Sequence, residues 1–566
     1  MFVLAQVTAL CGEYWVLVGV VADAGLVHGY GRGLMLGAVN GIQAEKEAVA
    51  VESGIAGGQA GGAGDEDGGA GAFARSRACF EELVTVLDDP AGGRLTHAQM
   101  EEQLTGLSRE LVRTLHQDSL DLRAIREKRP GPVTGSDQVR RGIVERGHDR
   151  GLATVFGEVT VVRMACRHRG AENLYPADAV LNLPEVKQSH GLARLAAIEA
   201  PRGSFGQAAA AIARATGVRV GRRQLEQLTV AAAADVDAFY AARKPGPSPG
   251  GTLLVMQFDG KGIVMRPEAL REATAKAAAG RQRKLATRLS PGEKNGRKRM
   301  AELGCVHDCE PVPRTPADII SRPGTKDAGR ARSRKDAPEA SGKWLTASVT
   351  DEIPAVIAAG FDEAERRDPA HERTWIALVD GNKQQIEAIE AEAAARGVTI
   401  TILIDFIHVL EYTWKAAWSF FETGNPAAEE WVAGQALKIL QGKAAQVAAG
   451  VRRRATTYGY SARERDGADT CASYLTAKKH YLGYDTALAS GWPIATGIIE
   501  GACRHIVKDR MDITGARWGL DGAEAILKLR ALNSNGDLDA YWQWHLEQEQ
   551  QRVHYARYQD PSFLAA

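Results

Sequence analysis

The chain has 566 residues, which exceeds the roughly 100–200 residues of a typical domain and predicts several domains, each with its own core. Lys plus Arg and Asp plus Glu each number 70, so the formal net charge is zero and a charged partner has to be recognised by local charge. Hydrophobic residues make up 45% and charged residues 25%, which excludes a mostly disordered or a fibrous protein.

Residues 1–77 are expected to form a weakly structured segment with a Gly-rich linker. Residues 57–69 are mostly glycine, alanine and acidic residues, which have little side chain to bury. Glu13 interrupts the apolar stretch at 2–21, and no uncharged run in it reaches the roughly 18 residues of a membrane helix. The seven scattered cysteines, odd in number, favour a reducing compartment. We therefore expect a cytoplasmic protein without a membrane segment.

Apolar residues at helical spacing predict a helical region over residues 78–150. One series begins at Phe80 and a second at Met100, which makes 78–127 a predicted helical hairpin. Beyond this region, the β-branched run at 156–163 is bounded by glycine and predicts a strand. A small mixed module is therefore expected after the helices.

Residues 204–240 have the pattern of two helices joined by a short turn. Ser204 and Gln207 match a capping box, and an alanine-rich run follows them. Gly217 stands where the first helix is expected to end. The second helix is predicted over 222–240.

Three arginines mark the start of the second predicted helix. With Arg219, Arg222 and Arg223 there, the helix pair resembles a helix-turn-helix whose second helix enters the major groove of DNA. This interpretation makes 151–245 a small mixed module followed by a DNA-binding region. A plain helical hairpin with a solvated basic edge explains the same pattern.

Three apolar runs that each end in an aspartate predict strands of an α/β core over 251–410. The runs and the aspartates that follow them are 252–258 with Asp259, 374–379 with Asp380, and 398–404 with Asp405. A predicted helix at 384–396 separates the last two runs, and α/β sheets gather functional groups at the carboxyl ends of their strands. Since neighbouring carboxylates repel, such a cluster is expected to bind a divalent cation. For any single Asp-Gly pair, a simple turn is the alternative.

Glu500 is a fourth candidate carboxylate, and two cations follow it at helical spacing. In a helix, Glu500, Arg504 and Lys508 would share one face, with Glu500 as a metal ligand and the two cations beside a phosphate. The alternative is a surface ion pair between Glu500 and Arg504.

The remaining segments complete the predicted organisation. An aromatic-rich helical pattern predicts an all-helical insertion at 411–489, before a final part of the core at 490–535 and a helical tail at 536–566. Residues 266–299 hold eleven basic and three acidic residues, a local balance of +8 (11 − 3), and are interpreted as a phosphate-tracking surface. The basic, Gly- and Pro-interrupted stretch at 323–343 is interpreted as a mobile loop.

Taken together, these motifs resemble the ISKra family of bacterial insertion-sequence transposases. The resemblance runs from about residue 156 onward, through Asp259-Gly, Asp380-Gly-Asn, Asp405-Phe-Ile-His408 and Gly497-Ile-Ile-Glu500. Its most specific segment is 507–518, which ends in Arg517-Trp518. The family belongs to the transposases that carry two aspartates and a glutamate on a ribonuclease H-like core.

The resemblance implies a multidomain α/β protein. Its ribonuclease H-like catalytic core would contain the all-helical insertion and would follow the helical and helix-turn-helix DNA-binding modules. Such a core has a hairpin and a helix between its first two catalytic strands. Residues 300–313 and 345–350 are assigned to the hairpin, and residues 353–365 to the helix.

The catalytic triad that the resemblance implies is Asp259, Asp380 and Glu500, separated by 121 (380 − 259) and 120 (500 − 380) residues. These carboxylates would hold two Mg²⁺ or Mn²⁺ ions, with Asp259 bridging both ions. Asp405 remains open as the second aspartate. Otherwise Asp405 and His408 would form the accessory Asp-x-x-His element, for which a helix N-cap with a satisfied histidine is the alternative.

The expected partner is double-stranded DNA, both the terminal repeats of the element and the target. The residues expected to contact DNA are Arg219, Arg222, Arg223, Arg504, Lys508, Arg510, Arg517 and Trp518. By analogy with the family, we expect a homodimer in a synaptic complex, located at the bacterial nucleoid in the cytoplasm.

The function expected from the resemblance is a transposase that cleaves DNA strands and joins them to a target. Two alternatives remain open. One is a catalytically inactive DNA-binding descendant of such an enzyme. The other is a ribonuclease H-like nuclease that cleaves without joining.

Overall fold

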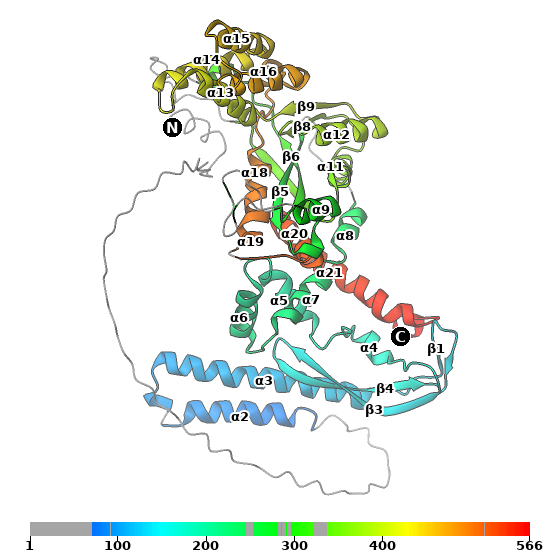
Figure 1. Cartoon of the computed structure of the whole chain (residues 1–566). Helices are drawn as coiled ribbons and strands as arrows, with labels where there is room; N and C mark the ends of the chain where they lie inside the picture. Colours follow the sequence, from blue (N-terminus) through cyan, green and yellow to red (C-terminus); the bar gives the residue numbers. More distant parts are fainter. Residues whose placement is uncertain are drawn as a thin grey trace, which may run out of the picture.

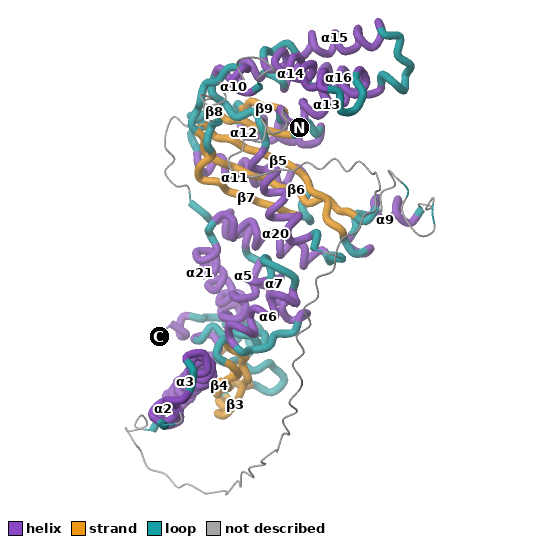
Figure 2. Tube along the Cα trace, turned by 90° about the vertical axis from the view of Figure 1, so that its left-hand side faces the viewer, coloured by secondary structure: helices purple, strands orange, loops and turns teal. Residues whose placement is uncertain are grey.

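A computed structural model describes most of the chain as a mixed α/β structure. The described residues are 71–90, 92–244, 253–280, 285, 290, 296–320, 337–513 and 515–565. The predicted linker before residue 71, much of the basic stretch at 266–299 and most of the one at 323–343 lie outside these ranges. The described elements are stacked along one long axis, with the main sheet between two sets of helices (Figures 1 and 2).

A helical hairpin opens the described chain, as predicted. It consists of α2 (Ala74–Asp88) and α3 (His97–Arg126), and the Thr96 side chain caps α3 in a capping box with Gln99. Arg75 Nε donates to Asp118 Oδ1 at 2.8 Å and fastens α2 to α3. Asp118 is buried, while the Arg75 side chain remains exposed to solvent.

The predicted helical region ends earlier than residue 150. After α3 come the short strands β1 (Val133–Thr134) and β2 (Arg140–Arg141), and then a long antiparallel hairpin of β3 (Ile143–Thr154) and β4 (Gly157–Arg167). The strand predicted at 156–163 is therefore confirmed, whereas the helical prediction for 127–150 is wrong. Pairing with the apolar β4 determines the conformation of β3, whose own sequence is polar and rich in glycine.

A cluster of helices follows the hairpin. It contains α4 (Pro176–Val180), α5 (His190–Glu199), α6 (Phe205–Thr216), α7 (Arg222–Ala233) and α8 (Val236–Ala242). The predicted capping box is present, with Gln207 N donating to Ser204 Oγ at 3.2 Å, and Gly217 ends α6 with a φ of 76°. The second predicted helix is broken between α7 and α8, because Asp235 binds His545 Nδ1 (2.6 Å) and Arg552 Nη1 (2.9 Å) of the C-terminal tail.

The central sheet has five strands in the order β7-β6-β5-β8-β9. They are β5 (Leu253–Val264), β6 (Lys298–Cys309), β7 (Ala340–Ser348), β8 (Thr374–Val379) and β9 (Ile400–Ile404). β5, β6 and β7 form antiparallel pairs, while β8 lies parallel to β5 and β9 parallel to β8. The hairpin assigned from the sequence is thus present as β6 and β7.

Asp259 was expected at the end of its strand, and this expectation is wrong. The parallel pairing of β5 with β8 stops at Gln257, but the antiparallel pairing with β6 carries β5 on to Val264. Asp259 therefore lies inside β5, where the parallel ladder ends and only the hairpin partner continues.

Both faces of the sheet are covered. Leu254, Met256 and Phe258 of β5 pack against α11 (Ile353–Arg367) and α12 (Lys383–Arg396). On the opposite face, the parallel half of the sheet packs against the helical insertion. The antiparallel half packs against α5 to α7 and against helices that follow the insertion.

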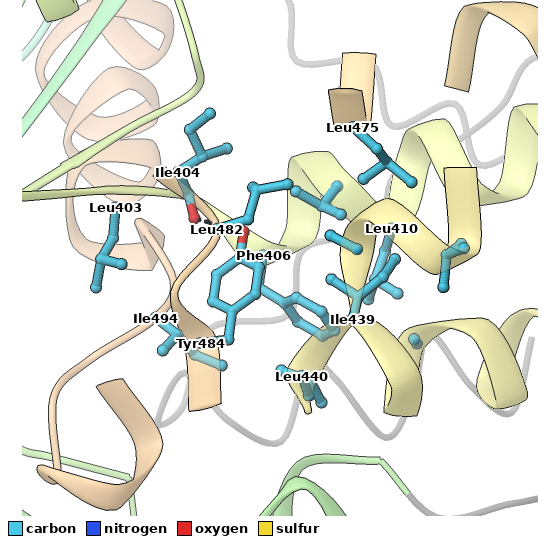
Figure 3. Packing of buried hydrophobic residues seen from close by; sticks show 14 of the residues in the cluster. Leu403, Ile404, Phe406, Leu410, Ile439, Leu440, Leu475, Leu482, Tyr484 and Ile494 are labelled. Carbon is cyan, nitrogen blue, oxygen red and sulfur yellow. Dashed lines mark hydrogen bonds between the residues drawn. The ribbon is translucent and has the colours of Figure 1, made fainter. Parts of the chain in front are cut away.

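The insertion is all-helical, as predicted. Its helices are α13 (Phe406–Phe420), α14 (Pro426–Leu440), α15 (Ala444–Thr457), α16 (Asp466–Ala477) and α17 (Tyr484–Ala489). Phe406 and Tyr484 meet edge to face, 5.3 Å between ring centroids, and Tyr484 Oη donates to Ile404 O at 2.8 Å (Figure 3). Because Leu403 and Leu440 join the same cluster, the sheet and the insertion share one hydrophobic core.

The final helices return to the sheet and then to the N-terminal elements. These elements are α18 (Gly497–Ala502), a π-helical turn (Cys503–Lys508), α19 (Asp509–Met511), α20 (Leu520–Asn535) and α21 (Leu538–Glu549). Beyond α21, Tyr558 forms an antiparallel bridge with Gly135, and α21 runs toward α4 and β1 in Figure 1. None of the helices in the described part of the chain combines the length and apolar character that a membrane crossing requires.

Candidate metal centre

Acidic side chains from three strands meet at one edge of the sheet. β5, β8 and β9 are parallel, and their register aligns Gln257 with Leu378 and Val379 with Ile404. Asp259, Asp380 and Asp405 therefore follow the ends of the parallel ladders on the same side of the sheet. This edge is where α/β sheets carry functional groups.

Two side chains at the ends of the parallel ladders attach α18 to this edge. α18 is the helix that carries Glu500. The buried Gln257 accepts a hydrogen bond from Ile499 N at 3.1 Å through its Oε1 atom. Asp405 Oδ1 accepts from Thr496 N at 3.3 Å. Glu500 is thereby held beside the aspartates, although 95 residues of chain separate it from Asp405 (500 − 405).

Asp259 is a partly buried carboxylate with two protein donors. Gly260 N donates to Oδ1 at 2.7 Å, and the thiol of Cys503 donates to Oδ2 at 3.2 Å. Burial raises the pKa of Asp259, and the negative charge of Asp380 adds to the rise. The negative charge of Asp380 is therefore close enough to disfavour ionisation of Asp259.

Asp380 lies in a tight turn between β8 and α12. Asn382 N donates to Asp380 Oδ1 at 2.7 Å, and Asn382 in turn caps α12 through Gln384 N at 2.9 Å. Gly381 has a φ of 95°, a conformation that glycine adopts without steric cost. Tyr474 Oη donates to the Asp380 carbonyl at 3.1 Å, so the insertion also supports this turn.

Asp405 is fully buried and already bound by protein donors. Its Oδ1 atom accepts from Ile407 N at 3.1 Å, which makes Asp405 the N-cap of α13. Its Oδ2 atom lies 3.1 Å from His408 Nδ1. Asp405 thus caps α13 and contacts His408, which is the local geometry that the alternative interpretation describes.

His408 lies among the carboxylates as a cation. Its hydrogen bond to Asp405 raises the pKa of His408 to about 9, with further increases from the charges of Glu411 and Asp380. The charge of His408 in turn opposes the rises in the pKa of Asp259 and Glu500. Ligand atoms of Asp405, His408 and Glu500 all lie within 4.8 Å of one another, a spacing at which they can hold a metal ion.

The cations that follow Glu500 lie in a π-helical turn that continues α18. Burial raises the pKa of Glu500 to about 6, with the charge of Asp405 as the next cause. The segment that follows is π-helical, so the 3.6-residue spacing on which the prediction relied does not apply. Arg504 and Lys508 are exposed. The acidic partner of Arg504 is Asp509 rather than Glu500, and Arg504 Nε lies 3.9 Å from Asp509 Oδ1.

Two residues near Asp259 were not predicted from the sequence. The first is Cys503, the thiol that contacts Asp259. The second is Glu302 of β6, which is only 8% exposed and pairs across the hairpin with Gly260. Burial, followed by the charges of Asp259 and Asp380, raises the pKa of Glu302 to about 7. Only the register of the hairpin, which sequence patterns do not fix, points to Glu302.

Most of the residues predicted to contact DNA are exposed. Exposed side chains are those of Arg219, Arg222, Arg223, Arg504, Lys508 and Arg517. Arg510 and Trp518 are buried, which contradicts the prediction that they contact DNA. Arg510 Nε donates to Ala200 O at 2.8 Å, and its guanidinium lies 4.6 Å above the Trp518 ring. These two residues fasten the end of α19 to the helix cluster instead.

The shifted pKa values predict how the metal-free protein responds to pH. Glu500 and Glu302 have raised pKa values, about 6 and about 7 against an ordinary 4.5, so the folded state holds more protons than the unfolded chain between pH 4.5 and 7. The free energy of unfolding should therefore fall as pH rises through this window, by about 3 kcal/mol for Glu302. His408 adds stability below pH 6.5 that is lost as pH rises through about 9.

Urea unfolding at pH 5 and at pH 7.5 measures this effect. The fall in stability should be smaller in Glu302→Gln, which lacks the titrating group. Mn²⁺ should raise the melting temperature more at pH 7.5 than at pH 5, because ionised carboxylates bind the cation. A wild-type protein and a Glu302→Gln variant with the same pH dependence would contradict the assignment.

The donors at this edge fit a hard divalent cation. They are carboxylate oxygens, partly buried and mutually repelling, which is the ligand type that Mg²⁺ and Mn²⁺ prefer. The described cysteines near the sheet are buried free thiols. Comparisons with protein-family models and with curated proteins find no match to this chain.

Proposed function

We propose that this chain is a DNA transposase that binds the ends of an insertion element and performs metal-dependent strand cleavage and strand transfer. The observation that carries the proposal is that Asp259, Asp380 and Asp405 lie at the same end of the parallel ladders, where α18 brings Glu500 beside Asp405 and His408. The strand order is β7-β6-β5-β8-β9, and β6 alone runs opposite to the other four strands. This arrangement supports a ribonuclease H-like core. The sequence resemblance points to the same class.

In this proposal Asp259, Asp380 and Glu500 hold two Mg²⁺ or Mn²⁺ ions. When bound, such ions activate a water or a 3′-hydroxyl as the nucleophile and stabilise the leaving oxygen. Asp259 would be the ligand that both ions share, as the family resemblance implies. His408 keeps a positive charge beside the carboxylates, and Asp405 fixes its ring orientation through the 3.1 Å contact.

Asp380 is favoured over Asp405 as the second catalytic aspartate. Asp405 is fully buried, and both of its oxygens are bound by protein donors, so it would have to give up a donor to bind a cation together with His408 and Glu500. Asp380 is partly exposed, and among the described residues its carboxylate accepts a hydrogen bond through Oδ1 alone. Asp405 and His408 then act as the positioning element beside the centre.

The exposed cations suit contact with the DNA backbone. Arg504 and Lys508 follow Glu500 within the π-helical turn, and Arg517 is exposed a few residues later. Phosphate contacts of this kind position DNA without reading its sequence. A homodimer bound to two element ends belongs to the proposal by analogy with other transposases.

Incubation of the protein with a labelled DNA that carries the ends of its own element tests the proposal. With Mg²⁺ or Mn²⁺ we expect cleaved ends and products joined to a target plasmid, and neither product in the presence of EDTA. Cleavage without joining would instead indicate a nuclease. Binding without cleavage in either metal would indicate an inactive descendant and contradict the catalytic proposal.

Replacing both Arg222 and Arg223 with alanine should weaken binding to element ends. Both side chains are exposed at the start of α7, where a helix-turn-helix would contact phosphates. Loss of two phosphate contacts should lower affinity by about tenfold and reduce the slope of log affinity against log salt by about 2. Fluorescence anisotropy at several salt concentrations measures both quantities.

The matched control replaces Arg77 and Arg94, two exposed arginines in or near the N-terminal hairpin, with alanine. This control should keep wild-type affinity and the wild-type salt slope. Equal losses in the two double variants would mean that the effect reflects total charge, and α6 and α7 would then be a plain helical pair.

A further inference from the structure

The helical hairpin of α2 and α3 has almost no hydrophobic core of its own. Both helices lie wholly within the described residues, and Leu120 is their one buried hydrophobic side chain. Leu120 packs against the β3–β4 hairpin rather than against α2. Polar contacts line part of the seam between the helices, from Ser76 N to Asp118 Oδ2 (3.1 Å) and from the Cys79 thiol to Thr114 Oγ1 (3.8 Å). Since amphipathic helices bury their apolar residues against a further layer, this hairpin lacks one layer of its packing.

The exposed hydrophobic residues of the hairpin gather on one face. Phe80, Val84 and Leu87 recur at helical spacing on α2, and Val112 and Leu115 lie on α3; the five side chains are 36–51% exposed. At about 100° per residue, the stripe on α2 and Leu115 on α3 are turned in the same sense away from the seam. Because the seam contacts run in opposite directions along the two helices, the helices are antiparallel and both stripes open onto the same side.

This face is turned away from the neighbouring β-hairpin. On the other flank of α3, Gln117 Oε1 accepts a hydrogen bond from Thr160 N at 2.7 Å, so β4 covers that side. α2 forms the outer rim of the structure, at the end opposite the helical insertion (Figures 1 and 2). A contiguous apolar face on the surface is typical of an interaction site.

The charges along the hairpin favour a second copy of this chain as the partner. Exposed Asp88 and Glu101 lie at the end where the two helices are connected, and exposed Arg123 and Arg126 lie at the far end of α3. Two hairpins stacked face to face in opposite directions bring the acidic end of each copy to the basic end of the other. Stacked in the same direction, they would place Asp88 of one copy over Glu101 of the other. Since exposed ion pairs contribute little affinity, these charges determine the direction of pairing and the apolar residues determine the affinity.

We propose that the α2–α3 hairpin is the dimerisation surface of this chain, and that two copies pair in opposite directions as a four-helix bundle. A two-fold axis across the face then packs α2 on α2 and α3 on α3 of the other copy. Val84 lies in the middle of the α2 stripe, so the axis brings it to the Val84 of the other copy. This inference rests on the homodimer of the proposed function and assigns its surface, but it requires neither metal nor DNA.

Sedimentation equilibrium of the full-length protein, without DNA or metal, tests the inference. Wild type should be a dimer at micromolar concentration. Val84→Glu combined with Leu115→Glu should raise the dissociation constant about 100-fold or more, because symmetry places each new charge in the interface twice. Val186→Glu, which changes an exposed valine outside the hairpin, should keep the wild-type dissociation constant. Circular dichroism should show the same helix content in all three proteins.

Cysteine cross-linking measures the direction of pairing. With copper phenanthroline as the oxidant, Val84→Cys should form a disulfide-linked dimer, because the residue meets its own copy at the two-fold axis. Val186→Cys should remain unlinked, and wild type gives the background from the native cysteines. A dimer in which Val84→Cys does not cross-link would overturn the pairing in opposite directions.

The surface itself is overturned by either of two results. One is a combined Val84→Glu and Leu115→Glu variant that stays dimeric, which would place the interface elsewhere. The other is a monomeric wild type, which would point to another occupant of the face, such as residues 1–70 of the same chain. Neither result involves DNA cleavage, so the proposed activity would still be decided separately by the assay with labelled element ends.

Discussion

Asp259→Asn should abolish DNA cleavage and strand transfer while leaving DNA binding within about twofold of wild type. The substitution keeps the shape of the side chain but removes the negative charge of the shared metal ligand. Because metal ions stabilise the charge that develops in phosphoryl transfer by several kcal/mol, the rate should fall about 1,000-fold or more. Gel assays with labelled element ends measure cleavage and joining, and anisotropy measures binding.

Two controls accompany this experiment. Asp88→Asn neutralises an exposed aspartate at the end of α2 and should leave cleavage unchanged. The melting temperature of Asp259→Asn should not fall, since the variant relieves repulsion with Asp380. Cleavage by Asp259→Asn at the wild-type rate would remove Asp259 from the catalytic centre.

Asp405→Ala should be among the most destabilising single substitutions in the core. It would remove the N-cap of α13, leave Thr496 N without its acceptor, and leave the partly buried His408 imidazolium without its partner. Breaking a buried ion pair from one side costs about 3–5 kcal/mol. Urea unfolding followed by circular dichroism should therefore show a loss of that size.

Asn382→Ala is the matched control, because Asn382 caps α12 from an exposed position and has no ion pair among the described residues. Loss of this cap alone should cost about 1 kcal/mol. Asp405→Asn should keep part of the stability and part of the cleavage activity, as expected of a positioning residue. If Asp405→Asn abolished cleavage as completely as Asp380→Asn, Asp405 would be the second catalytic aspartate.

The strands and helices of the core could be predicted because their buried residues form continuous apolar runs in the sequence. The run at 374–379 is buried at all but its first position, and β8 has the predicted bounds. The helix predicted at 384–396 begins one residue earlier, where Asn382 supplies the cap. In these segments local preference and tertiary packing agree, so the sequence pattern is sufficient.

Other features depend on contacts between distant segments. β3 is polar and becomes a strand through its pairing with β4, and the break between α7 and α8 depends on a C-terminal histidine and arginine that bind Asp235. Such contacts leave no periodic signal in the sequence. Predictions from local spacing therefore gave a helix at 127–150 and an unbroken helix at 222–240.

The residues of the candidate centre also differ in whether a local sequence pattern could reveal them. Asp259, Asp380 and Glu500 could be proposed from strand ends and from the family resemblance. The burial of Glu302 could not be predicted, because it follows from the register that pairs Glu302 with Gly260. The burial of Arg510 was missed for a related reason, since a cation in a basic segment is usually solvated, whereas this one stacks on Trp518.

The return of the C-terminal tail to the N-terminal elements has a consequence for the order in which the protein folds during synthesis. Arg552 binds Asp235, His554 Nε2 lies 2.7 Å from Leu183 O, and Tyr558 bridges to Gly135. The N-terminal elements leave the ribosome first but complete their packing only when these residues emerge. At about 5–20 residues per second, the 423 residues from Gly135 to Tyr558 (558 − 135) correspond to a delay of tens of seconds. During translation, the β1–α4 region is therefore exposed without its final cover.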